Sequence, residues 1–404
     1  MPAFASGSLH DPIDYPTVRE KPLDPPPELQ KLSNEGSIHS LRYPDGHIGW
    51  LITSHSLCRS VLADSIFSSR SELRRPAVRE GGVDALWGHK APPGLFIIMD
   101  PPEHTRFRRS LAGQFTARKM RDLEPHVEDL VKHHLDTIAQ TVPPVDLVDN
   151  FALPVPLYAI CELMGVPASD RDEFRKHVDT VQSLTSTEVE GAAALDALTS
   201  YLRGLITGKQ KRPESDLLSY LIQTEEFSID ELAGVGVLLV GAGHETTASM
   251  LSLSILTLLT HPDQLNLLMA DLTLLENAVE ELLRYLTIFQ FGITRTALED
   301  TSLDGVTIQK GQCVTLSLPA ANRDRKKFHE PDRFDITSNP RGHLAFARGI
   351  HQCLGQQMAR MELKVAIREL LIRFPSLALA QPMSCIPMRS ESVGYGVREL
   401  PVSW

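Results

Sequence analysis

One stretch of the chain predicts a helix that has to lie inside the protein. Residues 228–231 read Ser-Ile-Asp-Glu, a capping box that starts a helix. The roughly thirty residues that follow are apolar on nearly every face, which predicts a helix about 45 Å long that ends near His261-Pro262. A helix without a polar face is either buried in a core or spans a membrane. The rest of the chain has to be arranged around it.

Polar chemistry interrupts this helix at its centre. Residues 241–247 read Gly-Ala-Gly-His-Glu-Thr-Thr, so the acid Glu245 stands beside the hydroxyl of Thr246. A central acid argues against a membrane span, and we expect a buried central helix. The two glycines allow the close approach of a ligand, and a threonine can bond back to a carbonyl and bend the helix. The segment is either a kinked part of the core or an acid–alcohol pair that delivers protons over a bound cofactor.

Length alone would suggest two or three domains, but the sequence shows no boundary between them. The chain has 404 residues, 42% of them hydrophobic, and no linker, charge block or repeat divides it. We therefore expect a single domain over 1–404, with residues 1–27 as an irregular arm. The net charge of −11 argues against nucleic acid or an anionic membrane as the main partner. Five widely spaced cysteines without a Cys-x-x-Cys motif, and no signal peptide or anchor, predict a cytoplasmic location.

Helices dominate the rest of the pattern. Successive amphipathic helices are expected between residues 111 and 211, and shorter ones at 28–35, 56–63 and 263–286. Short strands are expected at 38–41, 49–53, 291–297, 301–318 and 392–398, with hairpin turns at Pro44-Asp-Gly and Asp304-Gly305. The sequence therefore predicts a mainly α protein with small antiparallel sheets.

A ten-residue stretch near the C-terminus centres on one cysteine. Residues 346–355 read Phe-Ala-Arg-Gly-Ile-His-Gln-Cys-Leu-Gly, and a helical pattern follows over 354–374. The pattern places Cys353 at a helix N-terminus, where the dipole favours a thiolate, which is a strong metal ligand. Gly349 and Gly355 bracket it and let the backbone approach a flat partner. A lone cysteine in such a place is more often a small buried side chain.

A second segment carries a pair of cations. Residues 99–109 contain two consecutive prolines that set a helix start. His104 and Arg108 are four residues apart and project from one helical face. Two donors on one face suit a carboxylate or a phosphate, although surface pairs of this kind are common.

Together these segments resemble the cytochrome P450 family, the haem-thiolate monooxygenases, over nearly the full length. The cysteine stretch matches Phe-Gly-x-Gly-x-His-x-Cys-x-Gly except at Ala347, which stands where the family has glycine and would be strained at positive φ. Residues 242–246 match Ala-Gly-x-Glu-Thr. Glu281 and Arg284 match Glu-x-x-Arg, and the resemblance implies a buried structural trio completed by Arg333. The sequences of residues 243–249, 280–286 and 351–355 are most similar to those of the soluble actinomycete branch.

The resemblance implies a fold and a cofactor. The fold would be the cytochrome P450 fold, a helix-rich triangular single domain with a long central helix. The cofactor would be haem b, with Cys353 as the proximal ligand of its iron. Glu245 and Thr246 would relay protons to dioxygen, and Ala242 and Gly243 would leave room for oxygen and substrate. The remaining cofactor contacts would come from propionate ligands and from the cysteine loop, namely His104, Arg108, Arg295, His351, Phe346, Gly349 and Gly355.

The implied reaction is hydroxylation or epoxidation of a bulky, mostly apolar small molecule, such as a polyketide, a macrolide or a xenobiotic. Its pocket would be built from residues 70–98 and 163–205, the least patterned stretches. The four arginines of the first stretch would serve as polar anchors or form a solvated face; they are Arg70, Arg74, Arg75 and Arg79.

The electrons have to come from a partner, because no Gly-x-Gly-x-x-Gly fingerprint follows a strand. We expect a ferredoxin or flavodoxin with its NAD(P)H-dependent reductase. An acidic surface of this electron carrier would meet Arg348, Arg360 and Lys364, on the face of the protein that carries Cys353.

Three other functions fit the same motifs. One is a haem-thiolate nitric oxide reductase that takes electrons directly from a nicotinamide nucleotide. Another is an enzyme of aromatic coupling or nitration. The third is a haem-binding carrier or sensor without turnover, which would have no need of the acid–alcohol pair.

Overall fold

The computed structural model describes residues 11–78, 87–182 and 187–404, and the chain separates into two compact units. The first unit comprises residues 1–90, 280–353 and 391–393, and the second comprises 91–279, 354–390 and 394–404. Each unit is assembled from segments that are far apart in the sequence. The described part of the predicted arm, residues 11–26, is irregular apart from a β-bridge between Ile13 and Leu41. The single-domain organisation stays a prediction.

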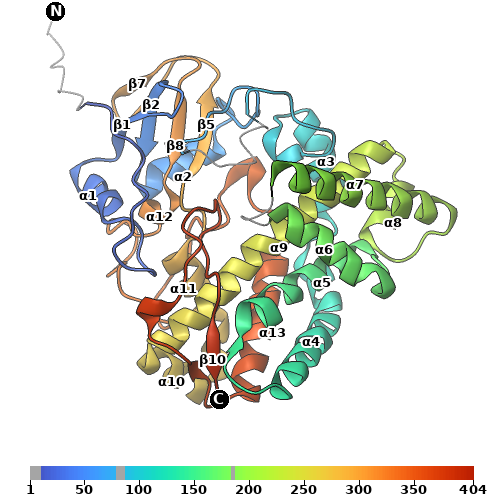
Figure 1. The fold of residues 1–404 in the computed structure, drawn as a ribbon. Coiled ribbons are helices and arrows are strands. Elements are labelled where there is room, and N and C mark those ends of the chain that lie inside the picture. Colours follow the sequence, from blue (N-terminus) through green and yellow to red (C-terminus); the bar gives the residue numbers. More distant parts are fainter. Residues whose placement is uncertain (1–10, 79–86, 183–186) are drawn as a thin grey trace, which may run out of the picture. The chain divides into compact units, whose positions relative to one another are not determined.

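The first unit is built on a five-stranded sheet in the order β1-β2-β8-β5-β3. Figure 1 labels β1, β2, β8 and β5 of this sheet. The strands are β1 (Ile38–Arg42), β2 (Ile48–Ile52), β3 (Phe67–Ser68), β5 (Ile293–Ala297) and β8 (Cys313–Leu316). All neighbouring strands are antiparallel except β2 and β8, which run parallel. A separate antiparallel hairpin joins β6 (Thr301–Leu303) to β7 (Val306–Ile308) through the expected Asp304-Gly305 turn. The predicted small sheets are confirmed.

Helices cover the core of the first unit. They are α1 (Pro27–Glu35), α2 (His55–Ala63), α12 (Leu318–Ala321) and the C-terminal part of α11 (Leu275–Leu286). One apolar cluster joins side chains of β2 and β8 to α2, among them Ile52, Leu316 and Val61, all with at most 1% of their surface exposed. This cluster supports the segment that leads into the cysteine loop, because Leu344 belongs to it.

The first unit also contains a buried ion pair. The Arg284 guanidinium donates to both carboxylate oxygens of Glu281 at 2.7 Å, and the two side chains are 3% and 0% exposed. Its remaining donors bind the backbone carbonyls of Asn322, Pro331 and Arg333 at 3.0, 2.8 and 3.3 Å. The expected trio is therefore wrong in one member, because the Arg333 side chain is 62% exposed and only its carbonyl takes part. Carbonyls satisfy the spare donors without adding a second buried cation.

The second unit is arranged around α9 (Ile229–Thr260), which begins at the predicted capping box of Ser228 (Figure 1). It packs against α5 (Pro154–Met164), α7 (Glu188–Lys211) and α13 (Gln356–Arg373). The other helices of the unit are α3 (Glu103–Ala112), α4 (Ala117–Ala139), α6 (Arg171–Gln182), α8 (Leu217–Gln223) and α10 (Pro262–Ala270). A three-stranded antiparallel sheet joins β4 (Val145–Asp146), β10 (Pro401–Ser403) and β9 (Ala378–Leu379). Within the described residues, no helix has the length and hydropathy needed to cross a membrane.

The strand expected at residues 392–398 is wrong. In its place a β-bridge joins Met388 to Val397, flanked by hydrogen bonds from the Arg389 N–H to the Gly396 carbonyl and from the Arg398 N–H to the Pro387 carbonyl at 2.9 and 2.8 Å. Two glycines in this stretch explain the difference, since glycine weakens a strand. We call residues 387–390 and 394–398 the C-terminal arms.

Helix α13 contains a buried acid that makes stability depend on pH. Glu362 is 3% exposed, and burial raises its pKa well above the usual 4.5. The folded protein therefore binds a proton that the unfolded chain has lost, and stability falls as pH rises above about 4.5 through the raised pKa, by up to about 1.4 kcal/mol per pH unit. We expect Glu362→Gln to remove this fall and to stabilise the protein at neutral pH, measured by urea unfolding across a pH series.

A second substitution on α13 provides the control. Glu369 pairs with Arg368 at 2.8 Å, so Glu369→Gln makes the same substitution at a carboxylate that has a counter-ion. Equal pH profiles for the two variants would contradict the assignment to Glu362.

Candidate functional site

Cys353 lies in a loop of the first unit. The loop folds back on itself through a hydrogen bond from the Cys353 N–H to the Phe346 carbonyl at 3.0 Å. A short 3₁₀ turn, Gly349–His351, lies inside it, and Phe346, His351 and Cys353 are half-buried. Helix α13 begins only at Gln356, so the expected position of the cysteine at the helix N-terminus is wrong by three residues. Gly355 occupies the N-cap position, and the two residues after the cysteine form a turn.

Two residues of this loop adopt the left-handed backbone conformation. Gly349 has φ of +78°, and a Cβ added to it would lie 2.1 Å from the carbonyl oxygen of Leu62 at the end of α2. Glycine is therefore required for the loop to approach α2. Ala347 has φ of 54°, which confirms the expected strain. For alanine this conformation costs about 1–2 kcal/mol.

The middle of α9 in the second unit differs from the rest of the helix. Most residues of α9 are buried, but Gly241 and Ala242 are exposed, and a Cβ built on Gly241 meets no atom within 4 Å. The Thr246 hydroxyl donates back to the Ala242 carbonyl at 2.6 Å, as expected for a threonine in a helix. The helix nevertheless continues unbroken. Its centre therefore presents backbone and small side chains on an open face.

His244 fixes this part of α9 to a neighbouring segment. It is fully buried, and its Nε2 lies 2.9 Å from the Leu153 carbonyl at the start of α5. Burial lowers its pKa to about 4, so the ring is neutral and Nε2 carries the proton that it donates. The residue beside Glu245 therefore contributes no charge at neutral pH.

Glu245 forms an ion pair that the sequence did not indicate. Its Oε1 accepts a hydrogen bond from Nη2 of Arg389 in the C-terminal arms at 2.6 Å, and the two side chains are 26% and 14% exposed. Burial raises the pKa of Glu245, and Arg389 opposes that rise. The arginine stands in the stretch Ile-Pro-Met-Arg, where no motif marked it.

The four expected propionate ligands divide between the units. His104 is buried in α3, and burial followed by the nearby charge of Arg108 lowers its pKa. The two residues are four positions apart in the same helix, so they lie on one face as expected. Arg295 in β5 of the first unit is 5% exposed and donates to the Thr294 carbonyl at 3.0 Å. His351 is half-buried in the cysteine loop. Each is held by an ordered element, as a ligand residue should be.

The arginines of the first predicted pocket stretch have partners in the first unit. Arg75 pairs with Asp45, and the Arg74 guanidinium lies 4.4 Å from the centre of the Trp87 ring. Arg70 is 3.9 Å from Glu72. Arg79 lies outside the described residues. A role as substrate anchors stays a prediction for all four.

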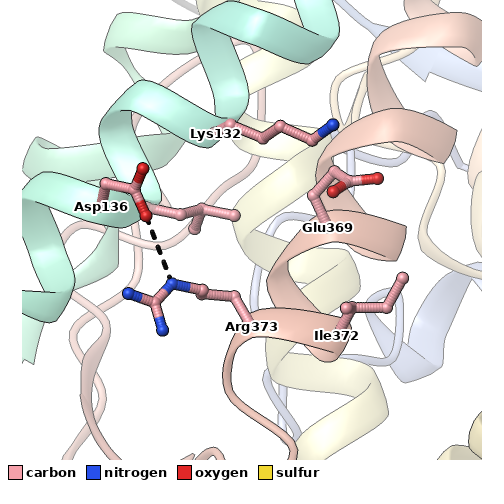
Figure 2. A pocket seen from close by; sticks show the side chains of 6 residues that line it. Lys132, Asp136, Glu369, Ile372 and Arg373 are labelled. Atoms are coloured by element: carbon pink, nitrogen blue, oxygen red, sulfur yellow. Dashed lines mark ion pairs between the residues drawn. The ribbon is translucent and has the colours of Figure 1, made fainter.

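A surface hollow of about 330 Å³ lies between α4 and α13 (Figure 2). Figure 2 shows it lined by charges of both signs, with Asp136 and Arg373 paired at 3.4 Å. It is near the last turn of α13, about 25 Å along the helix from Gln356. The hollow is therefore separate from the candidate site at the start of that helix.

The family model described as cytochrome P450 matches residues 155–402, more than half of the chain. The chain belongs to the cytochrome P450 family. Cytochrome P450 105C1 from a Streptomyces species is 43% identical over 97% of this chain and 99% of that protein. The vitamin D3 dihydroxylase of Streptomyces griseolus is 39% identical, with 96% of each chain covered.

Solved structures agree with this P450 over nearly the whole chain. Cytochrome P450 MoxA from Nonomuraea recticatena has a TM-score of 0.90 and 39% identity, covering 97% of this chain and 98% of that one. CYP105P1 in complex with filipin I has a TM-score of 0.88 and 38% identity, with 98% and 99% covered. The predicted fold class is confirmed, and this P450 is a haem-dependent monooxygenase of the kind found in actinomycetes.

The residues present in this P450 fit a haem. A porphyrin supplies four nitrogen ligands, so the protein needs to add one axial ligand and cations for two carboxylates. The cysteine loop presents one half-buried thiol. Gly349 of this loop lies so close to α2 that no Cβ could be accommodated there. Arg108 and Arg295 supply cationic donors, and His104 adds a buried imidazole that can donate a hydrogen bond. This donor set matches the needs of the group.

Proposed function

We propose that this P450 hydroxylates or epoxidises a bulky, mostly apolar small molecule, either a secondary metabolite such as a polyketide or macrolide, or a xenobiotic. The observation that carries the proposal is the acid–alcohol pair, Glu245 and Thr246, next to the open centre of α9. The relatives support the substrate class, since their names include a vitamin D3 dihydroxylase and a nocardicin C N-oxygenase, and one solved neighbour holds filipin I.

The proposal also names the residues that would hold the haem. Cys353 would bind the iron, and Phe346, Gly349 and Gly355 would shape the loop around it. The hydrogen-bond donors for the propionates would be His104, Arg108, Arg295 and His351. When bound, the haem supplies the iron that activates dioxygen, and thiolate donation favours O–O cleavage.

The chain's own residues would deliver protons and leave room for oxygen and substrate. The Thr246 hydroxyl donates to the Ala242 carbonyl, so it has to rotate away from that oxygen before it can donate elsewhere. Glu245 is the nearest acid in the sequence and provides the proton source. Ala242 is proposed to leave room for oxygen and substrate on the open face of α9. The same role is proposed for Gly243, although a Cβ added there would lie 3.4 Å from Ile160 of α5.

The electron donor in the proposal is a ferredoxin or flavodoxin with its NAD(P)H-dependent reductase. Arg360 and Lys364 lie on α13 with half-buried side chains, and Arg348 is exposed in the cysteine loop. Unchanged reduction rates in the charge-reversal variant Arg360→Glu/Lys364→Glu would contradict this docking surface. A cytoplasmic location is consistent with five free cysteines.

The carbon monoxide spectrum of the dithionite-reduced protein tests the ligand. We expect a strongly red-shifted Soret band in the wild type that is lost in Cys353→Ser, because serine cannot supply a thiolate. Cys58→Ser provides a matched control, since that thiol is fully buried in the apolar cluster of the first unit. A band at the position typical of histidine ligation would overturn the assignment.

Turnover separates the proposal from its alternatives. With ferredoxin, reductase and a substrate chosen by its low-to-high spin shift, the product should contain one added oxygen atom. Oxidation of NADH driven by nitric oxide without ferredoxin would favour the nitric oxide reductase, and a coupled or nitrated product would favour the enzyme of aromatic coupling or nitration. Low-spin iron that no tested compound converts to high spin would favour a sensor.

A further inference from the structure

The contact between Arg389 and Glu245 joins the C-terminal arms to the centre of α9. It is a charge-assisted hydrogen bond of 2.6 Å between two largely buried side chains. The two residues are 144 positions apart in the sequence. Glu245 is also the residue on which the proposed proton delivery depends. The contact therefore reaches the proposed chemistry directly.

The arms hold Arg389 in a fixed position relative to α9. The Arg389 N–H is bonded to the Gly396 carbonyl, and the bridge from Met388 to Val397 closes the ladder on one side. Gly396 in turn touches α9, because a Cβ added to it would lie 2.6 Å from the Ser249 hydroxyl. Ser249 is one turn of helix beyond Glu245. The backbone of Arg389 is thus held within the arms, and the arms contact α9 at Gly396.

We propose that Arg389 is a positioning residue, which holds the Glu245 carboxylate as an anion and has to loosen its grip before that carboxylate can carry a proton. The inference rests on the proposed role of Glu245 in proton delivery. In each cycle the carboxylate gains one proton from solvent and gives one proton towards Thr246. Arg389 stays protonated throughout, since a guanidinium donates hydrogen bonds and does not deprotonate in proteins.

The electrostatic surroundings of Glu245 give the inference a direction. Burial raises the pKa of the carboxyl and Arg389 lowers it, so removing the guanidinium leaves only the raising effect. His244 beside it is neutral above about pH 4. Arg175 on α6 acts on His244, and α5 contributes the Leu153 carbonyl to the same ring. Without Arg389, Glu245 should therefore titrate at a higher pH, by about one unit or more.

A purely structural role of the Arg389–Glu245 pair would give different experimental results. If the pair only docks the arms on α9, its loss would lower stability without moving the titration of Glu245. A second arginine provides a matched control for such a loss. Arg171 pairs with Glu162 at 2.5 Å, and these side chains are 22% and 38% exposed.

The test compares the holoenzymes of Arg389→Gln, Arg389→Lys, Glu245→Gln, the double variant Arg389→Gln/Glu245→Gln and Arg171→Gln. The first readout is independent of turnover: the infrared carbonyl band of protonated Glu245, identified by its absence in Glu245→Gln, is followed against pH. The second is the ratio of product formed to NADH consumed, across pH. Thermal unfolding and the carbon monoxide spectrum show whether each variant is folded and loaded.

We expect Arg389→Gln to shift both the infrared titration and the acidic limb of product formation to higher pH by about one unit or more. Arg389→Lys should shift both titrations less than Arg389→Gln does, because lysine keeps the positive charge but lacks the forked guanidinium donors. Glu245→Gln should lower product formation by about 100-fold, and the double variant should match it within about twofold, because the two residues act as one unit. Arg171→Gln should shift neither titration.

Two results would overturn the inference while leaving the proposed function intact. One is an unchanged titration of Glu245 in a folded Arg389→Gln. The other is a full additive loss in the double variant. Failure of the function itself has a different signature, since Glu245→Gln would then keep the product ratio of the wild type, or the wild type would lack the thiolate spectrum.

Discussion

Replacing Arg284 with methionine is expected to lower the free energy of unfolding by about 3–5 kcal/mol. Methionine fills a similar volume but leaves the carboxylate of Glu281, which is fully buried, without its counter-ion. The substitution also removes the donors of the carbonyls of Asn322, Pro331 and Arg333. Breaking one partner of a buried pair is far more damaging than replacing both, because an uncompensated charge remains inside.

The loss should extend to the cysteine loop. Asn322, whose carbonyl Arg284 binds, also accepts a hydrogen bond at its side-chain oxygen from the N–H of Leu344 at 2.7 Å, just before the loop. Arg284 therefore helps to hold the segment that delivers Cys353. We expect the variant to retain less haem, measured by the carbon monoxide spectrum per polypeptide, together with a lower midpoint in urea unfolding.

Two further variants make the comparison specific. Arg333→Met removes an arginine whose side chain is 62% exposed, and its effect should be below about 1 kcal/mol. The double variant Glu281→Met/Arg284→Met should recover part of the loss, since no charge is left buried. A double variant as unstable as Arg284→Met would mean that the lost carbonyl donors, and not the stranded charge, account for the effect.

Local patterns in the sequence were sufficient for most of the elements. The capping box at Ser228 and the apolar run after it fix α9, because both signals lie within the helix itself. The turns at Pro44-Asp-Gly and Asp304-Gly305 fix two hairpins for the same reason. The family motifs marked Cys353 and Glu245 because each lies in a short, contiguous string. These features need no knowledge of distant residues.

Other features depend on which distant residues meet, and the sequence could not provide them. The partner of Glu245 is 144 positions away, in a stretch with no periodicity to place it. The carbonyl of Arg333, not its side chain, completes the buried pair, because the local turn points the side chain to solvent. Helix α13 begins three residues after Cys353, because Leu354 and Gly355 form a turn. The propensities of these two residues do not reveal that turn. The first two features depend on tertiary geometry, and the third depends on a local turn that propensity does not reveal.

The second large effect is expected from Gly349→Ala, which should destabilise the protein by about 2–5 kcal/mol. A Cβ at this position would lie 2.1 Å from the Leu62 carbonyl oxygen, and backbone atoms on both sides would have to move. Overpacking of this kind costs about 1–3 kcal/mol. The left-handed conformation, with φ of +78°, adds about 1–2 kcal/mol for any residue with a side chain.

Gly342→Ala separates the two contributions. It also has a left-handed backbone, with φ of +86°, but its added Cβ would meet only the end of the Lys327 side chain, at 3.3 Å. A flexible side chain can move away, so this variant should show the conformational cost alone, about 1–2 kcal/mol. Equal losses in urea unfolding for the two variants would show that the approach to α2 contributes nothing.

The spectrum gives the functional side of the same comparison. Gly349 is four residues before Cys353, and the loop between them is closed by the hydrogen bond from the Cys353 N–H to the Phe346 carbonyl. If the loop is pushed away from α2, the thiol moves with it. Gly349→Ala should therefore lose the red-shifted carbon monoxide band at denaturant concentrations where Gly342→Ala still shows it. A band that persists until global unfolding in both variants would mean that the contact with Leu62 supports the fold but does not position Cys353.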